Sequence, residues 1–449
     1  MTWPSRLLRA TALLCLALGM TSGFASAQGV NRCSLNIRRA GERVERPDST
    51  RDGAITAFIG GPVTVSCGDA VMTGDSAVWR QATQQAVMIG NVRYRDTTRT
   101  LNSGRLTYNG SRDEVIAVDD VRLVRISSGA MLEGPRVTFT RAPIAGSRTV
   151  ATERPRMTLP SGRDGAGKGQ ITIVDADVAE FVGESEAFAS GNIEMVRGDI
   201  RATAKRAQFS ETAARAVLYE DAVIAGEGFD LAGDSIVAGF ELGELKTIHS
   251  FERAVASGNR FKLQADEIRA RLLGDQVEVI WAFGDGRSLA ASSEFTLAGD
   301  SIEFAFVEGR ADSVSAIGAA AAEHRADSIS IGEADLTEPE LSVGPGASWI
   351  AGDTVKAWFE PDDDLRPPEP ALDPESEPAD ARIRRLRAVG DARSFYAAVR
   401  DSARSLDPSR NYLLGSEIEI SFEGGEPSVL SGVDAIGVFL EPVKEGEGG

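Results

Sequence analysis

The chain contains only incomplete versions of nucleotide-binding, hydrolase and metal-binding motifs. The first of these is a Gly-rich stretch at 162–169. It is similar to a phosphate-binding loop, but Gly169 stands where such a loop needs Ser or Thr to reach Mg²⁺. The residues that follow, Ile171 to Val174, are typical of a strand, whereas a phosphate-binding loop begins a helix. We therefore expect a linker here and not a nucleotide site.

Asp and Ser recur side by side after a small residue, a pairing that invites a hydrolase interpretation. The copies are Gly74-Asp75-Ser76, Gly233-Asp234-Ser235, Gly299-Asp300-Ser301, Ala326-Asp327-Ser328 and, with Thr, Gly352-Asp353-Thr354. A catalytic Ser needs a base, and two histidines, His249 and His324, cannot serve five copies. Asp and Ser side chains bond their own backbone at turns, so we expect these phrases to be turns that begin strands.

Metal ligands are equally sparse. The acidic run Asp362-Asp363-Asp364 lacks the alternating ligands and the bidentate Glu of a calcium loop, and is expected to be solvated. Neither His249 nor His324 has a second His or a Cys nearby in sequence. The sequence therefore predicts no catalytic residue, no metal and no cofactor, and a protein that is not an enzyme.

The charge balance excludes one class of partner. The chain has 48 Lys and Arg against 67 Asp and Glu, a net charge of -19. Nucleic-acid binding needs a basic surface, so no nucleic-acid partner is expected. At 42% hydrophobic and 26% charged residues, the composition is that of an ordinary folded protein.

The first 27 residues have the pattern of a cleaved export signal. Arg6 and Arg9 precede the apolar run 10–20, and Ala25-Ser26-Ala27 is a small-residue cleavage site. The apolar run is shorter than the roughly 20 residues that span a bilayer. After cleavage Cys33 and Cys67 remain, and an exported chain permits a disulfide between them, worth about 3 kcal/mol on the chain-entropy model.

The fold class follows from short runs in which apolar and polar residues alternate. Such runs are 55–59, 302–306 and 418–422, in each of which alternate residues are apolar. Alternation with period two is typical of strands in an antiparallel sheet with one buried face. The chain is therefore predicted to be all-β.

The strands recur as an internal repeat. A second phrase, Gly-Asn or Asp before an apolar residue, is expected at strand starts, and its copies Asn91 and Asp120 lie 29 residues apart, as do Asn192 and Asp221. A period near 30 fits two strands with their turns, and such units bury their apolar faces only by stacking.

The expected organisation has seven segments. These are a signal peptide (1–27), a first β-domain (28–157), a Gly-rich loop (158–169), a second β-repeat region (170–360), an acidic Pro-rich insertion (361–381), closing strands (382–440) and a flexible tail (441–449).

Five short runs carry a pattern of small residue, Asp or Asn and alternating apolar residues: Gly68-Asp69-Ala70, Gly74-Asp75-Ser76-Ala77, Gly90-Asn91-Val92-Arg93-Tyr94, Leu106-Thr107-Tyr108 and Asp120-Val121-Arg122-Leu123. Through these runs the region from 53 to about 140 resembles the OstA-like family, which includes periplasmic lipopolysaccharide-transport proteins of the LptA type. A weaker copy covers about 170–360, and 385–440 is similar to the closing part of longer OstA-like chains. The chain differs from a simple LptA-type protein in its greater length, its acidic insertion and its negative charge.

The resemblance implies an elongated, open antiparallel β-jelly roll, shaped like a taco, with lipid acyl chains between its two sheets. Alternation places ten residues on the inner face, where core packing and lipid contact remain alternatives. They are Val92, Tyr94, Leu106, Val121, Leu123, Ile193, Met195, Ile302, Phe304 and Phe306.

The resemblance further implies a periplasmic, non-enzymatic protein that binds lipopolysaccharide or a related acylated lipid and transfers it toward the outer membrane, with which it is expected to associate. Its partners would be other lipopolysaccharide-transport proteins, or further copies of itself, paired end to end at the sheet edges. The alternative is an exported β-repeat scaffold that binds protein partners through its edge strands without a lipid. A third class, an enzyme acting on polysaccharide, would need two carboxylates in a groove.

Overall fold

The computed structural model describes residues 35–48, 53–141, 147–160, 170–226, 229–258, 261–274, 276–292, 295–324, 336–342, 348–360, 383–398, 409–423 and 426–440. The export signal, Cys33, the Gly-rich residues 161–169, the copy at 326–328, the insertion 361–381 and the tail 441–449 lie outside these ranges. Within them the chain forms strands and no helix, which confirms the all-β prediction.

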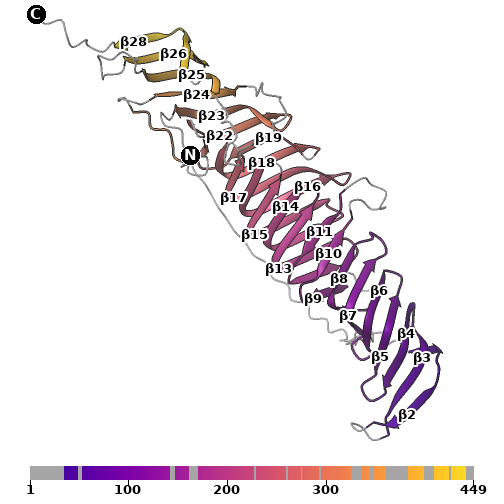
Figure 1. Ribbon diagram of the computed structural model, residues 1–449. Coiled ribbons are helices and arrows are strands. Elements are labelled where there is room, and N and C mark those ends of the chain that lie inside the picture. Colours follow the sequence, from indigo (N-terminus) through magenta and orange to yellow (C-terminus); the bar gives the residue numbers. More distant parts are fainter. Residues whose placement is uncertain are drawn as a thin grey trace, which may run out of the picture.

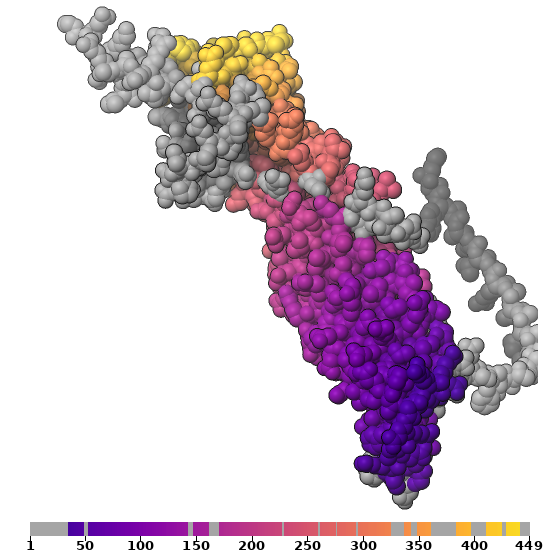
Figure 2. All heavy atoms as spheres, turned by 45° about the vertical axis from the view of Figure 1, so that its right-hand side comes forward, coloured from indigo at the N-terminus to yellow at the C-terminus, as the bar shows by residue number. Residues whose placement is uncertain are grey.

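The molecule is an elongated stack of antiparallel strands. Figure 1 shows them following one another along the long axis, from β2 and β3 at one end to β26 and β28 at the other. Figure 2 shows the colours of the chain succeeding one another along this body in sequence order. Each unit of the repeat therefore contacts mainly its neighbours in sequence, as the repeat period predicts.

Most strands are long and contain an irregularity of pairing near their middle. They are β3 (Ile55–Cys67), β4 (Ala70–Arg80), β5 (Gln85–Arg95), β6 (Arg99–Asn109), β7 (Glu114–Arg125), β8 (Met131–Thr140), β13 (Glu186–Arg197), β14 (Ile200–Ser210), β15 (Arg215–Gly226), β16 (Phe229–Glu241), β17 (Glu244–Gly258), β18 (Lys262–Leu273), β23 (Arg310–His324), β24 (Ser348–Phe359), β25 (Ile383–Ala398) and β26 (Ser409–Glu423). A β-bulge bends a strand, so these strands have two halves that point in different directions.

Elsewhere the two halves are separate strands. These pairs are β1 (Asn36–Arg39) and β2 (Arg43–Pro47), β9 (Arg148–Thr152) and β10 (Arg156–Leu159), β11 (Thr172–Asp175) and β12 (Val178–Val182), β19 (Gln276–Phe283) and β20 (Ser288–Ala291), β21 (Phe295–Gly299) and β22 (Ser301–Val307), and β27 (Glu426–Val433) and β28 (Ile436–Leu440).

The halves form two walls. Residues 71–73 of β4 pair with the second half of β5, which pairs in turn with residues 100–103 of β6, whereas 76–80, 85–89 and 105–109 pair separately. We call wall A the series that runs from β1 through the second half of β5, β10, β11, β20 and β21 to β28. Wall B runs from β2 through the first half of β5, β9, β12, β19 and β22 to β27. The bends form a fold line that joins the walls, and the hairpin turns at the opposite side form what we call the mouth.

The larger of two apolar clusters lies between the walls, and the smaller consists of Ala321, Trp349, Ala351 and Phe395. The buried residues of the larger cluster extend from Ile59 to Ile420. The cluster continues past the Gly-rich loop, because β10 pairs with β11 across it. The segments 28–157 and 170–360 therefore share one core.

The two recurring phrases meet at the fold line. Gly90 and Asn91 of β5 have φ of 76° and 47°, and the Asn91 side chain donates a hydrogen bond to Asp75 Oδ2 of β4 at 2.7 Å. Asn192 donates in the same way to Asp177 Oδ2 at 2.8 Å. A Cβ on Gly90 would lie 2.4 Å from Asp75 Oδ2, so glycine is required by both its φ and the close carboxylate. The expectation that these phrases are turns that begin strands is wrong for most described copies, because these lie inside long strands, where they make the bend; at Gly299-Asp300-Ser301 the bend separates β21 from β22.

This arrangement predicts that Gly90→Ala destabilises the protein more than Gly183→Ala. Gly183 also has a positive φ, 56°, but no atom within 4 Å of the added Cβ. We expect a loss of about 1 kcal/mol for Gly183→Ala and about 2–3 kcal/mol for Gly90→Ala, measured by urea unfolding. Equal losses would contradict a fold line that depends on the Gly90–Asp75 contact.

Candidate functional site

All ten residues expected on the inner face lie there. Wall A supplies Val92, Tyr94, Val121, Leu123, Ile193 and Met195, and wall B supplies Leu106, Ile302, Phe304 and Phe306. Nine are buried, and Phe306 is half-buried against the same core. Their placement follows the alternation; their contact with lipid stays a prediction.

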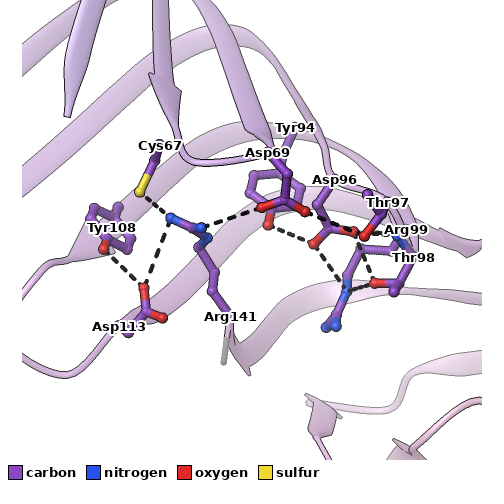
Figure 3. A network of polar contacts seen from close by, with 10 residues as sticks. All are labelled: Cys67, Asp69, Tyr94, Asp96, Thr97, Thr98, Arg99, Tyr108, Asp113 and Arg141. Atoms are coloured by element: carbon purple, nitrogen blue, oxygen red, sulfur yellow. Dashed lines mark hydrogen bonds and ion pairs between the residues drawn. The ribbon is translucent and has the colours of Figure 1, made fainter. Parts of the chain in front are cut away.

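Side chains, not backbone pairing, connect the walls at the mouth, and the first connection centres on Arg141 (Figure 3). Its guanidinium contacts Cys67 Sγ and lies 3.7 Å from Asp69 Oδ1, both in wall A. It also lies 3.9 Å from Asp113 Oδ1, in a wall B turn, beside the Tyr108 ring. We call such a connection a clasp. Cys67 takes part in a disulfide, and its expected partner, Cys33, lies outside the described residues.

The second clasp is Arg99, at the wall A end of β6. Its Nη1 donates to Thr149 Oγ1 of wall B at 3.0 Å, and its guanidinium lies 4.7 Å from the centre of the Phe139 ring. Asp96 Oδ2 lies 3.4 Å from Arg99 Nε and accepts a hydrogen bond from Tyr94 Oη at 2.7 Å (Figure 3). The Tyr94 ring packs edge-on against Phe139 of the opposite wall.

The third clasp is Arg125, at the wall A end of β7. Arg125 Nη1 lies 3.2 Å from Glu211 Oε1, and its Nη2 donates to the carbonyl oxygen of Glu186 at 3.1 Å. The guanidinium also lies 4.2 Å from the centre of the Phe181 ring. All three partners belong to wall B.

The fourth clasp is Arg197, at the end of β13. It donates to the carbonyl of Gln170 and to Thr172 Oγ1 in wall A, and to the carbonyl of Gly243 in wall B. Its guanidinium lies 4.9 Å from the centre of the Phe240 ring.

Farther along the chain, aromatic pairs connect the walls. Phe261 of wall A stacks on Phe304 of wall B with ring centres 4.7 Å apart, and lies 5.8 Å from Phe306. Phe295 of wall A and Phe359 of wall B lie 6.1 Å apart. The mouth is therefore polar and cationic in its N-terminal part and aromatic in its C-terminal part.

These arginines were not predicted from the sequence, although their positions carry a signal. Val121, Leu123 and Arg125 continue one alternation, as do Ile193, Met195 and Arg197. An arginine in the inward phase at the end of a strand must either leave the core or find partners across it. The signal was that Arg125 and Arg197 occupy inward positions of the strand alternation, and it was not part of any motif.

An apolar opening lies between the third and fourth clasps. It has a volume of about 200 Å³, and its lining comes from both walls. Wall A contributes Leu159 and Met195, and wall B contributes Ala187, Phe209 and Phe240. At this point the core is reached from solvent through the mouth.

His249, which could act as a base or a metal ligand, lies away from this opening. His249 bonds to Glu267 at 2.9 Å on the outer face of wall B, and its ring packs on Phe251. Among the described residues no group of His, Cys, Asp and Glu has the arrangement of a metal site. In the same part of the chain, no helix is long and apolar enough to cross a membrane.

Comparisons with known proteins found no match, neither among protein-family models nor among curated proteins. The function therefore has to be argued from the two walls, the mouth and the ends of the stack.

Burial shifts the pKa values of several side chains in the clasps. It raises the pKa of Tyr94, with Asp96 acting in the same direction, and burial and Asp113 raise the pKa of Tyr108 to about 12. Burial lowers the pKa of Arg125, while Glu211 opposes this effect. Burial alone would raise the pKa of Asp96, but hydrogen bonds from Tyr94 and Thr98 and the charge of Arg99 outweigh it and leave this pKa below its ordinary value.

The lowered pKa of Asp96 predicts a loss of stability in acid. Because the pKa of Asp96 is lower in the folded than in the unfolded protein, ionised Asp96 stabilises the fold at pH values above its unfolded pKa of about 3.9. This contribution is lost as the pH falls through the folded pKa. We expect Asp96→Asn to lower the thermal midpoint at pH 7, and the difference from the wild type to shrink between pH 5 and pH 3. A difference that stays constant over this range would contradict the assignment.

Proposed function

We propose that this protein binds the acyl chains of lipopolysaccharide, or of a related acylated lipid, between its walls and transfers them toward the outer membrane. The protein acts in the periplasm, after export directed by residues 1–27, and without catalysis. The observation that carries the proposal is a continuous apolar interior whose walls, in the described part of the chain, are joined by backbone along one side.

The physical reason is that a wall joined along one side can swing about that side. Opening the mouth locally separates a few side-chain contacts and leaves the strand pairing within each wall intact. A chain that enters is then shielded from water, which is worth about 0.8 kcal/mol per CH₂. The chain replaces contacts that the walls make with each other when they are closed, so binding and release remain reversible.

The ends of the stack support the proposed partners. Among the described strands, β1 and β2 pair only with β3 at one end, and β27 and β28 pair only with β26 at the other. Exposed apolar side chains gather at the second end, among them Ile436 at 74%, Val438 and Leu440. Unpaired strand edges accept further strands, so lipopolysaccharide-transport proteins or further copies of this chain are the proposed partners at both ends.

The alternative function, a scaffold that binds protein partners without lipid, is favoured by the same ends. It differs in one respect, because it requires the interior to stay closed. Contact of lipid with an inner-face side chain therefore distinguishes the two functions.

The experiment places a photo-reactive p-benzoylphenylalanine at Phe306, which is half-buried on the inner face. A matched variant carries it at Trp281, on the outer face of the same wall, where the indole Nε1 donates to Glu303. With purified mature protein and lipopolysaccharide, we expect cross-linking from position 306 and none from 281, because acyl chains lie between the walls.

Excess unlabelled lipopolysaccharide should compete for a fluorescent acyl probe in the same protein. Equal cross-linking from both positions, or none from 306 in a protein that melts as the wild type does, would leave the scaffold as the function.

A further inference from the structure

The last strand of wall A has the composition of an interior strand. β28 (Ile436–Leu440) contains no charged residue, and in the described part of the chain it pairs with β26 alone, at the end of the stack (Figure 1). Its side chains Ile436, Val438, Phe439 and Leu440 are each more than half exposed. A strand with apolar residues on both faces is typical of the middle of a sheet, where both faces are covered.

The inner face of β28 continues the apolar interior. Leu413 of β26 packs against the larger cluster and pairs with Gly437 of β28. Because side chains alternate between the two faces, Phe439 lies on this inner face as well. The interior therefore reaches the end of the stack, where the Phe439 ring is exposed to solvent.

The outer face of β28 is apolar too. Trp349 and its neighbours in the smaller cluster lie on the outer face of wall A, because they alternate with residues of the larger cluster. The strand pairing leads from Trp349 through Phe395 and Tyr412 to Val438. The Trp349 indole Nε1 donates to the carbonyl oxygen of Ser342 at 2.8 Å, so the chain itself covers this part of the layer, whereas Val438 is exposed.

The opposite end of the stack is different. β1 carries Arg38 and Arg39, and β2 carries Arg43, Glu45 and Arg46. Charged residues on an edge strand oppose the addition of a further strand. The stack therefore has one charged end and one end whose wall A strand is uncharged.

The backbone of β28 limits the kind of partner that fits it. An edge strand leaves a row of N–H and C=O groups that need partners. The hydrocarbon of a membrane cannot satisfy these groups, whereas a strand of another molecule pairs with them. β1 of another copy is a poor partner, because Arg38 and Arg39 would lie beside the apolar side chains of β28.

β28 of a second copy is the better partner. In an antiparallel pair with Val438 opposite Val438, Ile436 lies opposite Leu440 on the outer face. On the inner face Phe439 lies opposite Gly437, so the ring covers a position that has no side chain. Cross-strand pairs of apolar residues stabilise a sheet.

We infer that two copies of this protein associate through their C-terminal ends, by antiparallel pairing of the two β28 strands about a two-fold axis. Such an interface uses the same surface on both copies, so it closes as a dimer and does not extend into a filament. An axis normal to wall A keeps the inner faces of both copies on one side, so their apolar interiors adjoin. The inference rests on the part of the proposed function that assigns strand partners to the ends of the stack, and it names the partner and its orientation.

The first test is disulfide cross-linking of the mature protein, residues 28–449. Val438→Cys should give a covalent dimer under mild oxidation, because opposite residues of an antiparallel pair have Cα atoms about 4.5–5.5 Å apart, within reach of a disulfide. Ile37→Cys, at an exposed apolar position of β1, is the matched control and should give none. If tagged Val438→Cys cross-links to untagged Ile37→Cys instead of to itself, opposite ends associate and the inference is wrong.

A second variant tests the association without a cross-link. Val438→Lys places two like charges opposite each other and removes apolar burial, so the dissociation constant of the dimer should rise about tenfold or more in analytical ultracentrifugation. Ile37→Lys makes the same change at the other end and should leave the constant unchanged. A thermal midpoint equal to that of the wild type shows that Val438→Lys is folded. A wild type that sediments as a monomer at every concentration, or that binds phospholipid vesicles through Val438 as a monomer, would overturn the inference.

The outcomes also separate this inference from the proposed function. If the wild type cross-links lipopolysaccharide at position 306 but remains a monomer, only this inference is wrong. If Val438→Cys forms the covalent dimer and position 306 gives no cross-link to lipopolysaccharide, the dimer stands and lipid binding fails.

Discussion

The strand backbones join the two walls along the fold line, and everything else in the molecule depends on the bends that create this line. In β5 the bend has a backbone conformation that most residues avoid and is supported by a carboxylate on the neighbouring strand, as Gly90, Asn91 and Asp75 show. Without the bends, the strands would form a flat sheet with one apolar face in water. With them, the sheet closes on itself and buries that face over its whole length.

The mouth is held by a different kind of interaction. Each clasp consists of a few charge-assisted hydrogen bonds and a ring contact, and a hydrogen bond to a charged group contributes about 1.5–3 kcal/mol. A local opening breaks one or two clasps, whereas separation of the walls at the fold line would break the pairing of many strands. Because of this asymmetry, we propose the mouth as the side through which an acyl chain enters and leaves the interior.

Much of this architecture was predictable from the sequence. Alternation over 302–306 and around Val92 and Tyr94 placed these residues on the inner face, because period two leaves only two choices of face. The bends were not predicted, since Gly-Asn and Gly-Asp-Ser are equally suitable for hairpin turns and only the pairing register shows that strands continue through them. The clasps were not predicted because Arg99 and Thr149, or Arg125 and Glu211, lie far apart in sequence and meet only when the walls close.

The central claim is that the walls part at the mouth to admit a chain. It is tested most directly by pulsed electron spin resonance between nitroxides at Asp199 and Leu242, in hairpins on opposite walls beside the contact of Arg197 with Gly243. A second pair, at Arg201 and Asp230 within wall A, is the control. The account predicts that lipopolysaccharide lengthens the distance across the mouth and leaves the distance within wall A unchanged. An unchanged distance across the mouth in protein that has bound an acyl probe would contradict it.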